Sequence, residues 1–233
     1  MFKRVCVSLA FVALLCIVSQ ANAQLWGGGG GPYVMTFGPD LRELNDQLWP
    51  VLGKDFGERF VFLSGGYGSG SIAPNIRIGG SGADGKSTIS GNDRQTTLSI
   101  GYGGFLTEYV IPWGRFQFLV GGVLGGGNIG LKISRASDLN WDEFWQNFTS
   151  DSISSENFSG DISASFFYGE PYLGIQYAVT PWAYIKIDFG YSVIMLGSAS
   201  WKEGGKTLTG APDMNLSTPF VRAGVYFGYF GRE

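Results

Sequence analysis

Six charged residues occupy isolated positions in otherwise apolar or small-residue segments, and they have the clearest capacity for chemistry. They are three cations and three anions: Arg77, Glu108, Glu170, Lys186, Asp188 and Arg222. Paired carboxylates can act as general acid and general base. The same residues can also form a balanced network that neutralises each charge with its neighbours. We favour the network, and catalysis is the alternative.

The rest of the composition gives little support to catalysis. The chain has no histidine, which removes the commonest general base and the usual imidazole ligands of zinc and iron. Its two cysteines, Cys6 and Cys16, lie in the N-terminal leader described next. We therefore expect no catalytic residues, no metal and no cofactor, and we predict that the chain is not an enzyme.

Residues 1–23 have the layout of a secretory signal peptide. Lys3 and Arg4 precede an apolar run, and Ala21-Asn22-Ala23 predicts cleavage before Gln24. Cys16 as a lipidated N-terminus is the alternative, which the bulky residue before it disfavours. Without this segment 14 basic residues stand against 19 acidic ones, since two of the 16 basic residues lie in it. Phosphate binding needs a clustered basic surface, so we expect no nucleic-acid partner.

Residues 24–58 are expected to precede the main domain. Five consecutive glycines, Gly27 to Gly31, predict a flexible lead. Asp40 and Glu43 form a capping pair for a short amphipathic helix that Pro50 is expected to end.

Residues 59–233 alternate between apolar and small or polar residues, as strands do. Several segments exceed the roughly 9–11 residues with which a tilted strand crosses a bilayer. In the segment beginning at Ile185 one face is continuously apolar, while Lys186 and Asp188 fall on the other. Only 15% of the chain is charged, against about 25% in soluble domains.

These features predict an all-β fold, an antiparallel up-and-down transmembrane β-barrel of about eight strands, with ten as the alternative and a short N-terminal helix. The strand count depends on residues 82–95 and 196–210, each of which could be a strand hairpin or only a loop. A soluble β-sandwich is the other alternative. Its water-facing side would carry many Lys, Glu and Thr residues, whereas here the second face is mostly Gly, Ser and Tyr.

A Pro-Trp phrase occurs twice, as YVIPW from Tyr109 to Trp113 and as YAVTPW from Tyr177 to Trp182. Proline ends a strand, and amphipathic Tyr and Trp side chains are enriched where a membrane meets water. We predict that both phrases are turns at one membrane rim. A packed hairpin corner is the alternative.

The combination of export signal, alternating strands, aromatic rims and a mature chain without cysteine resembles the small outer-membrane β-barrels of Gram-negative-type envelopes over about 175 residues from Arg59. Shorter motifs, the Gly-rich opening with PDLRELN, RIGGSG and GYGGFLTEY, are similar to a group of uncharacterised secreted Gly-rich proteins. The first resemblance implies an outer-membrane location and a lipid bilayer partner. The second implies no activity.

One long loop, residues 136–160, carries an aromatic stripe. Its members stand at helical spacing, in the order Trp141, Phe144, Trp145 and Phe148. A surface partner could dock through residues 137–159, or the stripe could fold over the barrel mouth. The loop is also acidic, but it lacks the spacing of a calcium loop.

The expected function is that of an outer-membrane barrel with a structural or surface-binding role, its interior filled by the charge network. Two alternatives remain: a narrow pore or carrier for small molecules, and a soluble secreted β-rich binding protein in the periplasm or outside the cell.

Overall fold

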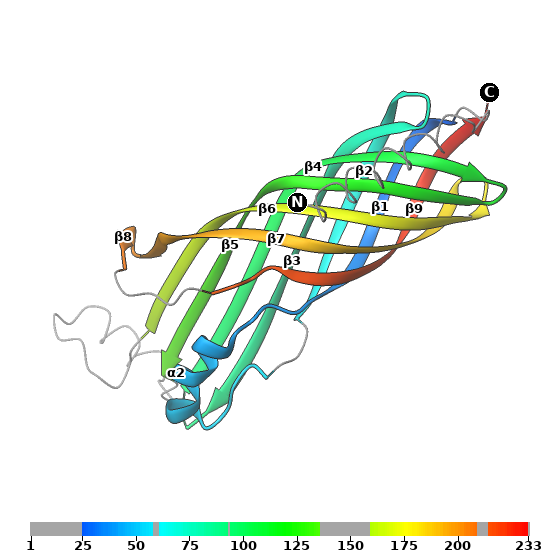
Figure 1. The fold of residues 1–233 in the computed structure, drawn as a ribbon. Helices are drawn as coiled ribbons and strands as arrows, with labels where there is room; N and C mark the ends of the chain where they lie inside the picture. The colour runs from blue at the N-terminus through cyan, green and yellow to red at the C-terminus, as the bar shows by residue number, and fades with distance from the viewer. Residues whose placement is uncertain (1–24, 58–60, 93, 136–158, 209–213, 233) are drawn as a thin grey trace, which may run out of the picture.

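The chain forms a closed antiparallel β-barrel in a computed structural model that describes residues 25–57, 61–92, 94–135, 159–208 and 214–232 (Figure 1). The barrel strands are β1 Leu25–Phe37, β2 Val61–Ala73, β3 Ile76–Gly91, β4 Arg94–Trp113, β5 Phe116–Arg135, β6 Ser159–Thr180, β7 Ala183–Glu203 and β9 Thr218–Arg232. Neighbours in the chain pair with each other, and β1 pairs with β9 to close the ring. The predicted all-β barrel of eight strands is confirmed.

The regions that would have made ten strands do not add any to the ring. Residues 83–91 extend β3, and β4 already begins at Arg94. Residues 196–203 extend β7, which pairs with the two-residue strand β8, Lys206–Thr207. The long hairpins therefore reach beyond the closed part of the barrel.

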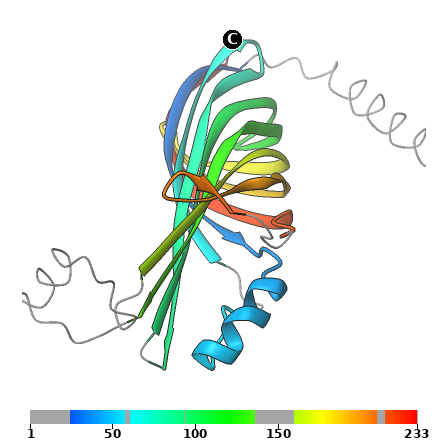
Figure 2. The same cartoon turned by 90° about the vertical axis from the view of Figure 1, so that its left-hand side faces the viewer.

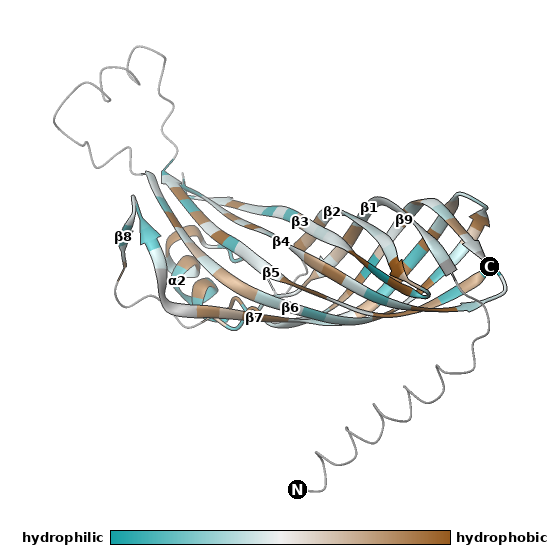
Figure 3. Ribbon diagram, turned by 90° about the horizontal axis from the view of Figure 1, so that it is seen from above, coloured by the Kyte–Doolittle hydropathy of each residue, from teal (hydrophilic) through white to brown (hydrophobic). Residues whose placement is uncertain are grey.

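Hydrophobic and hydrophilic residues alternate along many of the strands (Figure 3), and their exposure separates an apolar outside from a mixed inside. In β7, Ile185 and Ile187 are 49% and 40% exposed, whereas Lys186 and Asp188 between them are only 2% and 1% exposed. The same pattern in β9 exposes Val221 and buries Arg222. Successive strand side chains point to opposite faces, so the sequence pattern fixes which residues line the lumen.

The two ends of the barrel differ. At the terminal end, where Leu25 pairs with Arg232, short turns join β2 to β3, β4 to β5, and β6 to β7. At the opposite end, which we call the mouth, β1 connects to β2 through helix α2, Arg42–Leu52 (Figures 1 and 2). The connections from β5 to β6 and from β7 to β9 also lie at the mouth.

Strand β1 corrects the expected flexible lead over residues 24–58. Gly28 to Gly31 pair with β2 on one side, and Gly27 to Gly30 pair with β9 on the other. Glycine has no side chain to alternate, so its strands give no periodic signal. The backbone hydrogen bonds that close the ring hold the segment instead.

Helix α2 differs from its expected form at both ends. Leu41, not Asp40, occupies the N-cap position and makes no side-chain cap, while the Asp40 carboxylate accepts hydrogen bonds from the backbone N–H of Arg42 at 3.2 Å and from its guanidinium. Pro50 lies inside the last turn, and the helix ends at left-handed Gly53, whose N–H donates to the Trp49 carbonyl. Among the described residues no helix is long and apolar enough to cross a membrane.

Candidate functional site

Five of the six predicted charges form one continuous chain inside the barrel. It runs Glu108, Lys186, Asp188, Arg222, Glu170, so that anions and cations alternate. Lys186 donates to Glu108 and lies 3.5 Å from Asp188. Arg222 Nε donates to Asp188 Oδ2 at 2.8 Å, and its Nη1 donates to Glu170 Oε2 at 3.5 Å.

Four different strands supply this chain of charges, and β7 carries its middle. Lys186 and Asp188 are two residues apart in β7 and therefore point to the same side. Asp188 is the register partner of Arg222 in β9, which explains their short contact. Glu108 comes from β4, three strands from β7 in the ring, and Glu170 comes from β6, which pairs directly with β7. The barrel curvature, not sequence proximity, brings the carboxylates to the cations.

Tyrosines surround the charges and contact several of them. The Tyr172 hydroxyl donates to Glu108 Oε1 at 2.6 Å, and the Tyr102 hydroxyl lies 3.4 Å from Glu170 Oε1. Lys186 Nζ stands 4.5 Å from the centroid of the Tyr67 ring, and the Arg222 guanidinium carbon stands 4.8 Å from that of Tyr172. Cations over aromatic faces gain electrostatic stabilisation.

The sequence analysis did not single out these tyrosines. Each lies at an inward position of its strand and is buried, as Tyr33, Tyr67, Tyr102, Tyr172 and Tyr226 all are. The alternation that located the charges would also have located the tyrosines. Their chemical role depends on distances between strands, which no local pattern contains.

Arg77 stands apart from the other five charges. Although Glu108 is its register partner, its Nη2 donates to Gln117 Oε1 at 2.7 Å and its Nη1 to Gln176 Oε1 at 3.4 Å. Its guanidinium carbon lies 3.7 Å from the centroid of the Phe230 ring. The six predicted residues thus occupy two places, a chain of five charges and a separate arginine held by amides and a ring.

This interior can neutralise charge and exclude solvent. An eight-stranded barrel is just wide enough for its side chains to fill. All six charged residues are at most 2% exposed, and large rings pack between them. The described residues hold no group of three or more His, Cys, Asp or Glu side chains arranged for a metal ion.

The predicted interface aromatics all lie at the terminal end. Trp113 and Trp182 are 68% and 59% exposed, and Tyr109 and Tyr177 are partly exposed. The Trp113 ring stacks 5.9 Å from that of Phe118, and the Trp182 ring stacks 6.2 Å from that of Phe227. Both Pro-Trp phrases therefore contribute to one outward-facing group of aromatic rings.

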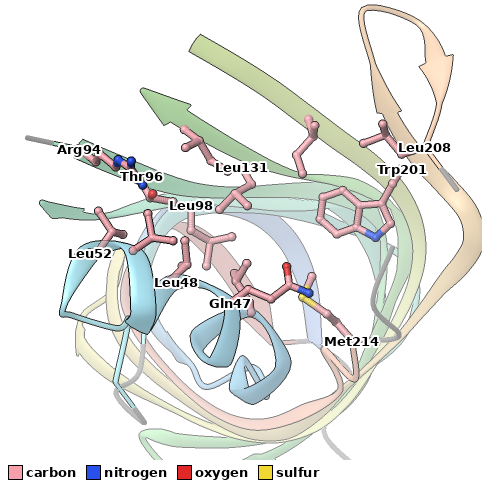
Figure 4. A pocket seen from close by; sticks show the side chains of 14 residues that line it. Gln47, Leu48, Leu52, Arg94, Thr96, Leu98, Leu131, Trp201, Leu208 and Met214 are labelled. Atoms are coloured by element: carbon pink, nitrogen blue, oxygen red, sulfur yellow. The ribbon is translucent and has the colours of Figure 1, made fainter. Parts of the chain in front are cut away.

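A second candidate site, a cavity of about 380 Å³, lies at the mouth between α2 and the barrel wall (Figure 4). Leu48 and Leu52 of α2 face Leu98 of β4, Leu131 of β5 and Trp201 of β7 across it. Small-molecule sites are mostly apolar and span roughly 300–1,000 Å³. The sequence analysis missed this site, since nothing local to α2 indicates which end of the barrel it covers.

The aromatic stripe of Trp141, Phe144, Trp145 and Phe148 lies outside the described residues, as do the predicted signal peptide and most of loop 136–160.

No family model matches the chain, and no curated protein matches it. Solved structures of similar fold include Neisserial surface protein A, at 12% identity and a TM-score of 0.40, covering 87% of this chain and 96% of that one. They include Ail, the attachment invasion locus protein of Yersinia pestis, solved with the heparin analogue sucrose octasulfate, at 12% identity and a TM-score of 0.40, covering 89% and 99%. Such likeness carries no argument about a ligand or an activity.

One further comparison corrects the prediction that the chain is not an enzyme. The outer membrane protease OmpT from Escherichia coli also has a similar fold, at 10% identity and a TM-score of 0.35, covering 90% of this chain and 98% of that one.

Proposed function

We propose that this protein is an outer-membrane β-barrel that has a lumen closed by its charge network and a structural or surface-binding role at its mouth. The observation that carries the proposal is the inversion of polarity across the barrel wall. Outward positions such as Phe62, Phe167 and Leu124 are more than 70% exposed, whereas arginine, lysine and glutamate are buried inside. A surrounding bilayer makes such an outside favourable.

The aromatic rings of the terminal end support the same placement. Outer-membrane barrels carry aromatic girdles where the apolar band meets water. Trp113, Phe116, Tyr177 and Trp182 are exposed or partly exposed around this end, next to the short turns. In such barrels short turns face the periplasm and longer connections face outward. By this rule the mouth and α2 face the cell exterior.

The test begins with fractionation of cells that express the full-length chain, followed by electrophoresis of the membrane fraction with and without boiling. We expect recovery with the outer membrane and a heat-dependent change in mobility, because a closed barrel resists detergent until it is boiled. Recovery as a soluble protein without detergent would overturn the proposal and favour a secreted β-rich binding protein.

A conductance measurement tests the closed lumen separately. The purified barrel in planar lipid bilayers is expected to show no ion current, because rings and paired charges fill its interior. A steady current that changes in Arg222→Gln would instead indicate a narrow pore. Arg94→Gln, at the mouth and outside the charge chain, is the control.

A further inference from the structure

The cavity at the mouth contains two buried polar groups without a partner. Thr96 is fully buried and Trp201 is 4% exposed. Neither the Thr96 hydroxyl nor the Trp201 indole N–H has a hydrogen-bond partner among the described residues, and both residues line the cavity. Buried polar groups in native proteins are almost always paired, so each unpaired one requires an explanation.

A cation stands beside one of these groups. Arg94 and Thr96 are two residues apart in β4, so both point toward the cavity, and Arg94 lies closer to the strand end (Figure 4). Arg94 is partly exposed and forms no ion pair with a described residue. A guanidinium presents a planar fork of N–H donors that matches a carboxylate, and a neighbouring hydroxyl can donate one further hydrogen bond.

Trp201 lies on the far side of the cavity. It belongs to β7, three strands from Thr96 in β4, and the ring order places β5 and β6 between them. Adjacent strands are about 4.8 Å apart, so roughly 14 Å of wall separates β4 from β7. One small anion cannot satisfy both ends. The indole N–H can only donate, so it requires an acceptor oxygen of its own.

Leucine side chains occupy the space between the two polar ends. Leu48 and Leu52 of α2 close one side, and Leu98 and Leu131 form the wall opposite. Apolar surroundings favour an aliphatic ligand body, since each buried methylene contributes about 0.8 kcal/mol in transfer from water. The cavity therefore combines an anion-binding end, an aliphatic middle and a single donor at the other end.

We propose that this cavity binds an elongated aliphatic carboxylic acid that carries a second oxygen along its chain. The carboxylate accepts hydrogen bonds from Arg94 and Thr96, and the second oxygen accepts one from the Trp201 N–H. A single-chain acid fits the wall better than a two-chain phospholipid, because the site offers one cationic group and one further donor. The inference goes beyond the proposed function.

The experiment is native mass spectrometry of the folded barrel, residues 24–233, titrated with 12-hydroxystearic acid, stearic acid and the methyl ester of stearic acid. We expect the hydroxy acid to bind best and the ester worst, at one ligand per barrel. Equal binding of all three would show simple apolar partitioning and overturn the proposal. Absence of binding to a folded barrel would also overturn it.

Substitutions of the lining residues test which side chain binds the carboxylate of the ligand. Arg94→Gln is expected to weaken both acids roughly tenfold and to leave the ester unchanged, since a hydrogen bond to a charged group is lost. Arg135→Gln is the matched control, because it removes a charge from the register partner in β5, which does not line the cavity. Unchanged acid binding in Arg94→Gln would contradict the assigned carboxylate position.

The unpaired groups are tested in the same way. Thr96→Val is expected to weaken both acids severalfold, and Trp201→Phe to remove only the advantage of the hydroxy acid over stearic acid. Tyr168→Phe is the control, since it removes another buried hydroxyl without a described partner, away from the cavity. Each variant is first tested for its heat-dependent gel mobility, so a failed barrel is distinguished from a failed binding site.

Discussion

The lumen and the mouth of the same barrel differ in how their side chains occupy the interior. In the lumen, charges and rings occupy the space, and Lys186 and Arg222 each contact two carboxylates. At the mouth, leucines of α2 and the wall leave a cavity of about 380 Å³, and two buried polar groups lack partners. The lumen also holds atoms without a partner among the described residues, such as Asp188 Oδ1 and Arg222 Nη2, but its side chains fill the space, whereas those at the mouth leave room for a further molecule.

Removing Lys186 should have the largest effect, because it breaks the lumen network between Glu108 and Asp188. Lys186→Met leaves Glu108 buried beside Tyr172 without its cation. Removal of one partner from a buried ion pair costs about 3–5 kcal/mol. The measurement is a urea titration of the barrel in lipid vesicles, in which gel mobility reports the folded fraction.

The control for Lys186→Met is Lys86→Met, because Lys86 is an exposed strand lysine. A second variant, Lys186→Met combined with Glu108→Gln, should recover part of the loss, since no buried charge then lacks its partner. Equal stability of Lys186→Met and Lys86→Met would show that the lumen charges do not act together.

Truncating one leucine in each region should reveal a smaller difference in the free energy of unfolding than the loss of Lys186 causes. Leu106 is fully buried in the middle of β4, whereas Leu131 borders the cavity. We expect Leu106→Ala to cost about 3 kcal/mol and Leu131→Ala about 1–2 kcal/mol less, because a side chain beside an existing void loses fewer contacts. The same urea titration checks both, and the reverse order would indicate that the cavity is filled.

A glycine of β1 tests how tightly the lumen is closed at its seam. A Cβ added to Gly29 would stand 2.2 Å from the Phe227 carbonyl oxygen and 2.7 Å from the Tyr226 ring, whereas one added to Gly68 would meet only the Gly29 carbonyl at 3.6 Å. Gly29→Ala should therefore cost about 1–3 kcal/mol by overpacking. Gly68→Ala should be nearly neutral, and equal effects would mean that β1 does not pack as described.

The sequence predicted the features that depend on local alternation. Apolar Ile185 and Ile187 pointed outward and Lys186 and Asp188 inward because strand periodicity alone fixes the face. Strand β1 was not predicted, because its glycines have no side chains that could alternate. The cavity was missed because Leu48 in α2 and Leu131 in β5 come to line one space only after the whole barrel has closed. Contacts of that kind depend on topology and on register, which the sequence pattern does not specify.

The smallest effect is expected from the exposed pair at the start of α2, which sharpens the contrast with the buried charges. The Arg42 side chain, with help from the Arg42 backbone N–H, lowers the pKa of Asp40 to about 2. A lowered pKa stabilises the folded state at pH values above the pKa that Asp40 has in the unfolded chain, and this contribution is lost as the pH falls toward 2.

In Arg42→Gln, an NMR titration should show the Asp40 pKa returning toward its usual range, with no measurable change in the free energy of unfolding. An exposed pair gains little, because water screens both charges and both side chains lose freedom. If Arg42→Gln instead destabilised the barrel as much as Lys186→Met does, burial would not be what distinguishes the lumen from the mouth.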